Sequence, residues 1–204
     1  MPARVFLAID PSAGSRRTLA RLQGALRDQD PSWVSEKWVR PDLLHVTVRF
    51  IGAMSDAEVP LLIELLTASM VQEPCFDLTL DGVRAMPGAR RAAMLWATLT
   101  GDVGRLDRLR AAVAQAVLDA TDVHPVASAF RPHVTLARAR RPHRFDDTAI
   151  EAARALLTGS VKDPDRIMSV RSLTLYASTL TATGPIYTRL GEMALCPSCQ
   201  QSGD

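Results

Sequence analysis

The most constraining feature of the sequence is a four-residue segment that occurs twice, as HVTV at His45–Val48 and as HVTL at His133–Leu136. Both copies lie in runs of apolar, β-forming residues, which predict strands. Side chains alternate between the two faces of a strand, so the histidine and the threonine of each copy project to one face and the two apolar residues to the other. Each strand is therefore expected to bury one face and to present an imidazole beside a hydroxyl on the opposite face.

Period-2 alternation and turn residues predict the strands of the chain. A strand is expected at residues 4–9, and a short one begins at Lys37. The strand of the first copy is expected from about Leu43 to Ile51, ended by Gly52, so that this copy lies in mid-strand. Further strands are expected at residues 75–87, at 92–100, within the segment 130–145 with Pro132 opening the strand, at 167–180 as one long strand, and at 184–195 as its hairpin partner.

Apolar residues at helical spacing predict helices at residues 11–30, 55–70, 104–120 and near 146–157. Pro11 and Ser12 give the start signal of the first helix, whose apolar stripe consists of Leu19, Leu22 and Leu26. Ser55 and Glu58 have the spacing of a capping box at the start of the second helix.

Helices that interrupt strands, with mostly hairpin-length connections between the strands, indicate an α+β fold with antiparallel sheets. No linker separates independent units, so residues 1–195 are expected to form a single domain. The two similar motif strands suggest two lobes of one compact unit. Residues 196–204 are expected to form a disordered tail, in which Cys196 and Cys199 are free thiols rather than a zinc or redox site.

The composition is that of an ordinary folded protein. Of the 204 residues, 47% are hydrophobic and 23% are charged, which disfavours a disordered or fibrous class. No apolar stretch approaches the roughly 20 residues of a membrane span, and the opening segment MPARVFLAID lacks the long apolar region of a leader. Three cysteines are few for a secreted scaffold. A cytoplasmic monomer without membrane contact is expected.

Arginine carries almost all of the positive charge, because Lys37 and Lys162 are the only lysines among 24 basic residues. A guanidinium donates two parallel hydrogen bonds to an oxyanion, which suits phosphate. Codon usage that favours arginine and alanine explains the bias more simply, so we assign phosphate recognition only to specific positions. The basic run Arg138–Arg144 can contact the phosphates of a substrate or form a solvated surface, and both interpretations stay open.

Two imidazoles that face each other suit concerted acid–base catalysis, because histidine has an ordinary pKa of about 6.5. If His45 and His133 exchange protons with substrate oxygens, the hydroxyls of Thr47 and Thr135 can hold non-bridging oxygens. This set predicts phosphoryl transfer at a phosphodiester. A metal site is the competing use of paired histidines, but neither copy has a further histidine or carboxylate at ligand spacing, so neither metal nor cofactor is expected.

The other candidate side chains are assigned structural roles. His124 and His143 stand beside prolines in expected loops and receive no function. Trp38 and Trp96 fall in expected strands and are predicted to belong to the core rather than to a base-stacking platform. Arg131 is expected to order the entry to the second motif strand.

With these motifs, the chain resembles the bacterial and archaeal RNA 2',3'-cyclic phosphodiesterases, also called 2'-5' RNA ligases, of the two-histidine phosphoesterase superfamily. The resemblance spans most of the chain and is carried by RVFLAID, KWVRPDLLHVTVRFIG, MLWATL, FRPHVTLAR and SLTLYASTLTATGPIYTRL. It implies a bilobal α+β fold in which two antiparallel sheets flank a central groove, with the helices outside and one motif in each lobe.

The resemblance also implies the reaction and its residues. His133 would activate water against a 2',3'-cyclic phosphate on an RNA end or a nucleotide, and His45 would protonate the 3' oxygen as it leaves, which gives a 2'-phosphate. Thr47 and Thr135 match the hydroxyls that hold the phosphate.

The resemblance further implies that Phe50 and Arg138 hold the terminal base, as a phenyl face and a guanidinium can do without strong sequence preference. Each lies five residues after its histidine. In a regular strand an odd offset points to the opposite face, so this role requires that both residues lie past the strand ends.

Two alternatives to hydrolysis stay open. The first is 2'-5' ligation, in which a 5' hydroxyl takes the place of water. The second is a non-catalytic module that binds RNA ends or nucleotides. The two intact motifs disfavour this alternative, because binding alone does not require two titratable histidines.

Overall fold

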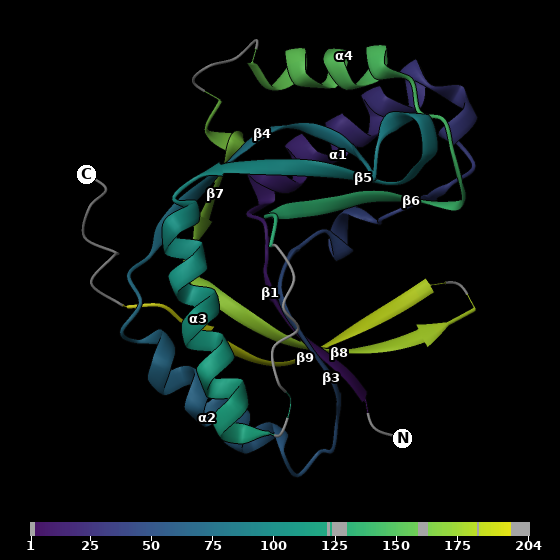
Figure 1. The fold of residues 1–204 in the computed structure, drawn as a ribbon. Coiled ribbons are helices and arrows are strands. Elements are labelled where there is room, and N and C mark those ends of the chain that lie inside the picture. The colour runs from purple at the N-terminus through teal and green to yellow at the C-terminus, as the bar shows by residue number, and fades with distance from the viewer. Residues whose placement is uncertain (1–2, 122, 124–129, 159–162, 183, 197–204) are drawn as a thin grey trace.

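The computed structural model describes residues 3–121, 123, 130–158, 163–182 and 184–196. Helices lie on the outside of a curled antiparallel sheet (Figure 1). The strands are β1 (Ala3–Ile9), β2 (Lys37–Trp38), β3 (Val46–Met54), β4 (Phe76–Met86), β5 (Ala92–Gly101), β6 (His133–His143), β7 (Ile167–Val170), β8 (Ser172–Thr181) and β9 (Gly184–Ala194). The α-helices are α1 (Ala13–Gln29), α2 (Val59–Met70), α3 (Val103–Ala120) and α4 (Asp147–Thr158).

The sheet has two halves that meet at a narrow waist. Its strand order is β7-β4-β5-β6-β3-β1-β8-β9, with β2 added on β6, and every pairing is antiparallel. At the waist β3 and β6 share one register pair, Val46 with Val134. The predicted α+β fold with antiparallel sheets is thus confirmed, and the two expected sheets are joined at this pair. We call the half from β7 to β6 the upper half and the half from β3 to β9 the lower half, as they stand in Figure 1.

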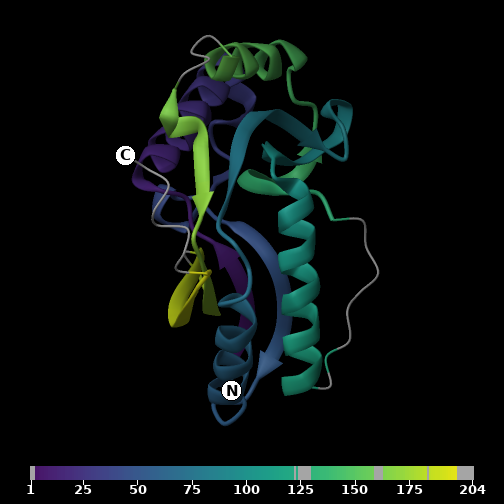
Figure 2. The ribbon, with the colours of Figure 1, turned by 90° about the vertical axis from the view of Figure 1, so that its left-hand side faces the viewer.

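Each half has its own pair of helices. Helices α1 and α4 pack together over the upper half, where α4 contacts β4. Helix α2 packs on α3 and on β9, and α3 runs beside β3 along the lower half (Figure 2).

The first helix forms as its sequence predicts. The Ser12 hydroxyl accepts a hydrogen bond from the Ser15 backbone N–H at 3.1 Å, which caps the helix start. The predicted stripe of Leu19, Leu22 and Leu26 is fully buried. The capping-box prediction for the second helix is only half right, because α2 begins after Glu58 and has no side-chain cap. Glu58 instead reaches back and accepts from the Ser55 N–H at 2.7 Å.

The predicted long strand at residues 167–180 is wrong, because Arg171 divides it into β7 and β8. The buried positions are Met168 and Val170 before the break, and Leu173 and Leu175 after it. The period of two therefore slips by one residue at Arg171. Strand β7 pairs with β4 in the upper half, whereas β8 pairs with β1 in the lower half, so the break is where the chain crosses the waist.

Two expectations fall mainly on residues that the structure leaves out. His124 and the tail from 197 to 204 lie outside the described residues. Cys196 is described, and its backbone N–H donates to the Glu73 carbonyl at 2.9 Å. Among the described helices, none combines the length and the apolar character that crossing a membrane requires.

Candidate active site

The waist pair places both motifs on one face of the sheet. Directly opposed residues in an antiparallel pair point to the same side, and both Val46 and Val134 are fully buried. Their neighbours in each strand therefore point to the other side, and these are the four motif side chains His45, Thr47, His133 and Thr135, all partly exposed. In this register the histidines are diagonal neighbours, a relation that separates residues by about 7–8 Å. That spacing suits two groups that flank one phosphate.

The first motif lies at a strand start, not in mid-strand as predicted. Strand β3 begins at Val46, one residue after His45, and β6 begins at His133. A short 3-10 turn at Pro41–Leu43 precedes the first histidine, and Pro132 precedes the second. The prolines delay pairing, so each histidine stands where its strand enters the waist.

A β-bulge follows the first motif. On β1, Ala8 lies opposite Thr47 and Leu7 lies opposite Arg49, which leaves Val48 as an extra residue without a partner of its own. An extra residue on one strand shifts the alternation of all side chains beyond it by one position.

A second bulge occurs at the same place in the second motif. On β5, Trp96 lies opposite Thr135 and Leu95 lies opposite Ala137, which leaves Leu136 as the extra residue. The fourth residue of each motif, Val48 or Leu136, is thus the bulged one, and both are buried.

The two bulges bring Phe50 and Arg138 to the face of the histidines. Phe50 lies opposite Phe6, on the same face of β1 as the partner of Thr47. Arg138 lies opposite Met94, on the same face of β5 as the partner of Thr135. Both residues remain within their strands, so sharing a face with the histidines does not require that they lie past the strand ends. The odd offset of five is compensated by the bulge, which regular alternation cannot predict.

His45 is held by hydrogen bonds and by rings. Its Nδ1–H donates to the Leu43 carbonyl at 2.8 Å, and its Nε2 is 3.0 Å from the Thr47 hydroxyl. The Phe6 ring lies 5.1 Å from the imidazole, and Tyr187 meets it edge-on at 5.5 Å. The carbonyl can only accept, so the neutral imidazole carries its proton on Nδ1 and turns Nε2 toward the exposed face.

His133 has the same arrangement with a different ring. Its Nδ1–H donates to the Arg131 carbonyl at 2.7 Å. Trp96 stacks on the imidazole with 3.7 Å between centroids and 16° between planes. The prediction that Trp96 belongs only to the core is therefore corrected, because its indole forms the surface on which His133 rests. Trp38 matches its predicted structural role, and its Nε1–H donates to the Trp33 carbonyl at 2.8 Å.

Burial and nearby charges shift both histidines. Burial is the largest effect and lowers the pKa of His45 and of His133 below the ordinary 6.5. The positive charge of Arg138 lowers both pKa values further. The Asp10 carboxylate acts in the opposite direction and raises the pKa of His45. Asp10 thus favours a proton on His45 and distinguishes the two imidazoles.

Sequence reasoning missed Asp10 and its surroundings. Its carboxylate accepts hydrogen bonds from the Thr174 hydroxyl at 2.8 Å and from the Tyr176 hydroxyl at 3.0 Å. Arg16 lies 3.8 Å from it and donates to the Pro41 carbonyl at 2.9 Å, which links Asp10 to the turn before His45. Residues this far apart in the chain are brought together by the pairing of β1 with β8 and by the packing of α1 on the turn at Pro41–Leu43.

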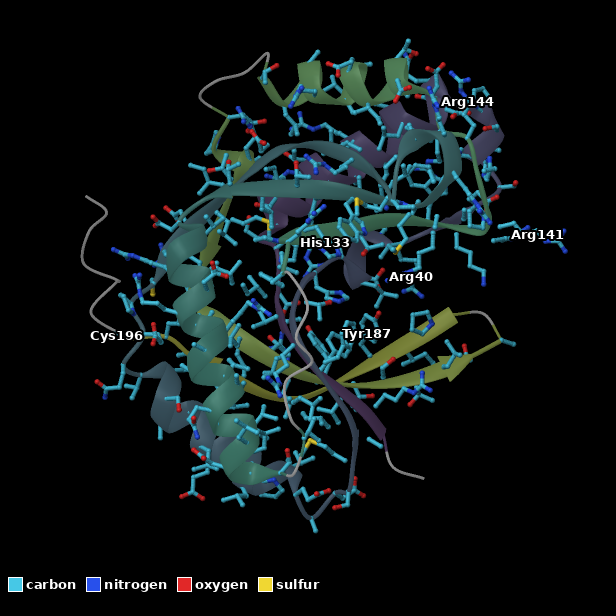
Figure 3. All side chains as sticks on the ribbon, in the orientation of Figure 1. Arg40, His133, Arg141, Arg144, Tyr187 and Cys196 are labelled. Carbon is cyan, nitrogen blue, oxygen red and sulfur yellow. The ribbon has the colours of Figure 1, made fainter. Side chains whose placement is uncertain are left out.

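An aromatic surface extends from His45 across the lower half. Phe6 is its centre and lies 5.9 Å from Phe50, 5.5 Å from Tyr176 and 5.0 Å from Tyr187. Phe50 is 72% exposed, whereas Phe6 is buried. Tyr187 stands on the lower half and His133 on the upper half above it (Figure 3). The only sequence signal for Tyr187 was its place in the alternating segment GPIYTRL.

The remaining predicted side chains lie elsewhere. His143 ends β6 instead of lying in a loop, stacks on Trp33 with 4.8 Å between centroids, and has its Nε2 3.3 Å from Glu36. Arg140 and Arg141 are exposed beyond Arg138 on β6. Within the described residues, no three His, Cys, Asp or Glu side chains gather as metal ligands would.

The similarity to known proteins agrees with this geometry. A model of the 2'-5' RNA ligase superfamily matches residues 11–180. The RNA 2',3'-cyclic phosphodiesterase of Aeropyrum pernix is 31% identical over 180 residues, which cover 88% of this chain and 96% of the relative. The enzyme of the same name from Methanothermobacter thermautotrophicus is 26% identical over 195 residues, covering 92% of this chain and 96% of the relative.

Solved structures share the fold. The apo structure of E. coli LigT is 25% identical, covers 96% of this chain and 98% of its own, and has a TM-score of 0.67. A protein from Thermus thermophilus is 23% identical, with a TM-score of 0.73 and coverage of 94% of this chain and 97% of its own.

Proposed function

Because the chain belongs to the 2'-5' RNA ligase superfamily, we propose that it hydrolyses the 2',3'-cyclic phosphate of an RNA end or a nucleotide to a 2'-phosphate, without a metal. The observation that carries the proposal is the Val46–Val134 pair, which presents both His-x-Thr motifs on one face of the sheet. Relatives named RNA 2',3'-cyclic phosphodiesterase, which match almost the whole chain, support the substrate class.

The reaction needs one proton acceptor and one proton donor. His133, whose Nδ1–H is fixed on the Arg131 carbonyl, takes a proton from water through Nε2. The water oxygen forms a bond to phosphorus as the bond from phosphorus to the 3' oxygen breaks. His45 gives its Nε2 proton to that oxygen, and the nearby negative charge of Asp10 favours the protonated form that this step requires. Proton exchange with solvent then restores both imidazoles.

The remaining side chains bind the substrate. The hydroxyls of Thr47 and Thr135 donate to the non-bridging oxygens, and Arg138 adds positive charge on the same face. Phe50, exposed at the edge of the aromatic surface, and the Arg138 guanidinium hold the terminal base. Ligation by the same pair, with a 5' hydroxyl in place of water, is the second activity that the superfamily suggests.

The direct test is turnover of a nucleoside 2',3'-cyclic phosphate in the presence of EDTA, with identification of the product. We expect a 2'-phosphate, and we expect His45→Ala and His133→Ala each to lower kcat/KM by about 10²- to 10⁴-fold. His143→Ala is the matched control, because that ring packs on Trp33 away from the motifs.

Three outcomes would contradict the proposal. Absence of turnover by the wild type would leave the non-catalytic binding module, and loss of turnover with EDTA would refute metal independence. A 3'-phosphate product would show that the leaving oxygen is the 2' one. The proposal also includes a cytoplasmic monomer, which size-exclusion chromatography with light scattering and cell fractionation test.

A further inference from the structure

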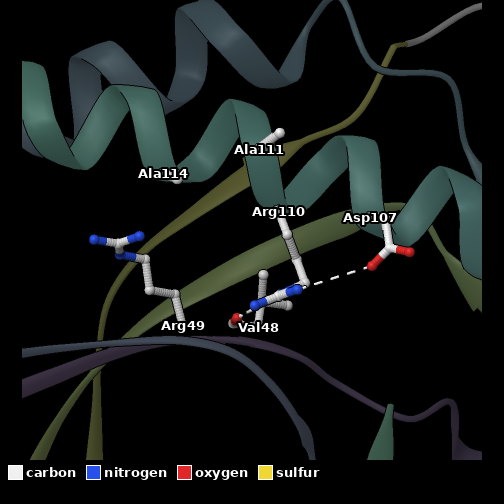
Figure 4. A pocket seen from close by; sticks show the side chains of 6 residues that line it. All are labelled: Val48, Arg49, Asp107, Arg110, Ala111 and Ala114. Carbon is white, nitrogen blue, oxygen red and sulfur yellow. Dashed lines mark hydrogen bonds and ion pairs between the residues drawn. The ribbon is translucent and has the colours of Figure 1, made fainter. Parts of the chain in front are cut away.

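Besides the face that carries the histidines, the structure has a charged pocket between β3 and α3. It has a volume of about 280 Å³ and is lined by Val48, Arg49, Asp107, Arg110, Ala111 and Ala114 (Figure 4). A water molecule takes about 30 Å³ in the liquid, so the pocket has room for a phosphoryl group. Arg49 lies opposite Leu7, on the other face of the sheet from Phe50. The pocket is therefore separate from the face that carries the histidines.

The Arg49 guanidinium is incompletely satisfied. One Nη donates to the Val123 carbonyl at 3.1 Å, but the Nε–H is buried and has no hydrogen-bond partner in the described part of the chain. None of the described carboxylates lies within ion-pair distance of this side chain. A buried donor without an acceptor is unfavourable, so a ligand oxygen that accepts a hydrogen bond from this Nε–H would stabilise the site.

Arg110 brings a second guanidinium to the same pocket. It stacks on the Phe130 ring at 3.7 Å, and its Nε is 3.5 Å from the Val48 carbonyl. Its ion pair with Asp107 is long, at 3.8 Å, and that carboxylate is mostly exposed. Among the described carboxylates, the exposed Asp107 is the only one that pairs with Arg110, and none pairs with Arg49. Burial lowers the pKa of both arginines, and the charge of Arg110 lowers the pKa of Arg49 further, so an anion bound between the two guanidinium groups would offset their like charge.

We propose that the pocket of Arg49 and Arg110 is a second anion site, which binds a phosphate group of a small molecule while the histidine face binds substrate. A tetrahedral oxyanion can accept the orphan Nε–H of Arg49 together with hydrogen bonds from Arg110, in the geometry that guanidinium groups provide. Val48 lines this pocket and is also the bulged residue beside Thr47. The proposal stands whether or not the chain hydrolyses cyclic phosphates.

The arginine Nε–H resonances provide a local test by NMR. Inorganic phosphate should shift the signals of Arg49 and Arg110 along one saturable curve, and should do so equally in a His45→Ala, His133→Ala variant. The Arg49→Gln, Arg110→Gln variant should lose at least about tenfold in affinity, as expected for charge-assisted hydrogen bonds. Arg108→Gln is the matched control, because this exposed arginine lies on the same helix outside the pocket. Arg49→Lys, which keeps the charge, should bind with intermediate affinity.

Three results would overturn the proposal. The first is that inorganic phosphate does not shift the Arg49 signal. The second is that chloride at equal ionic strength produces the same shift, which would mean that phosphate acts only by screening charge. The third is a shift caused by an RNA oligonucleotide but not by inorganic phosphate, which would assign the pocket to the substrate backbone. In that case the arginines would serve the proposed reaction instead of a separate ligand.

Discussion

The two imidazoles of the waist have equivalent backbone contacts but different ring environments. The His133 ring lies flat on Trp96, whereas the His45 ring is tilted by 37° to Phe6 and meets Tyr187 edge-on at 83°. A flat stack fixes the plane of His133, and the Nδ1 bond to the Arg131 carbonyl fixes its rotation within that plane. Trp96 is therefore a positioning residue for the proposed proton acceptor.

Removal of this stack should slow the reaction more than it weakens binding. Trp96→Leu is expected to lower kcat about two- to tenfold with little change in KM, because an aromatic pair contributes about 0.5–1.5 kcal/mol. Trp96→Phe should recover part of the loss. Steady-state kinetics at several pH values, with the Tm measured beside them, provide the check. An unchanged kcat in Trp96→Leu would refute the positioning role.

The pH dependence follows from the direction of the pKa shifts. Catalysis requires one protonated and one neutral histidine, so kcat/KM should have a bell-shaped pH profile with its maximum between the two pKa values. Burial lowers the pKa of both His45 and His133 below 6.5, so the peak should lie below pH 6.5 and the rate should fall as pH rises above it.

The charge of Arg138 contributes to both shifts. Arg138→Gln removes a positive charge that lowers both pKa values, so its peak should move to higher pH, while Arg141→Gln, on the same strand, should leave it in place. A wild-type peak above pH 6.5, or an unmoved peak in Arg138→Gln, would contradict this account.

At the scale of elements, the sequence predicts the alternation of the motifs but not their bulges. Alternation within HVTV and HVTL is local, so it gives the shared face of each histidine and threonine correctly. A bulge is defined by the partner strand, and neither Val48 nor Leu136 differs in type from an ordinary strand residue. Local alternation likewise does not predict the break at Arg171 or the positions of Asp10 and Tyr187 near His45, because these depend on which strands become neighbours.

The junction between β5 and α3 depends on one glycine. Gly101 has φ +93°, and a Cβ there would lie 2.9 Å from the Asp77 carbonyl oxygen. Gly101→Ala should therefore lower the free energy of unfolding by about 1–3 kcal/mol. Gly88→Ala is the control, since its φ is −177° and nothing lies within 4 Å of the new Cβ. Urea denaturation measures both, and equal stabilities would refute the steric argument.

At the scale of the whole molecule, the chain crosses the waist repeatedly. Strand β1 belongs to the lower half, α1 to the upper half, β3 to the lower half and β4 to the upper half, and the crossing at Arg171 returns the chain to β8. Neither half is a continuous piece of sequence. One half cannot unfold without pulling segments of the other out of their packing.

The two halves should consequently unfold in one transition. All three tryptophans lie in the upper half, at Trp33, Trp38 and Trp96, whereas both tyrosines, Tyr176 and Tyr187, lie on β8 and β9 of the lower half. Tryptophan fluorescence and tyrosine near-ultraviolet dichroism therefore report on different halves. Their midpoints in urea should coincide. Separate midpoints would show that the waist uncouples the halves.

The paired bulges also limit how this site can be re-engineered. Between the histidine and Phe50 or Arg138, each motif strand has one residue more than its neighbour, so the distance in sequence to the proposed base contact is odd although both residues share a face. Deleting a single residue to straighten either strand would turn Phe50 or Arg138 to the helix side, whereas adding or removing two would preserve the face. Designed variants and grafted loops at this site must therefore change length in even steps.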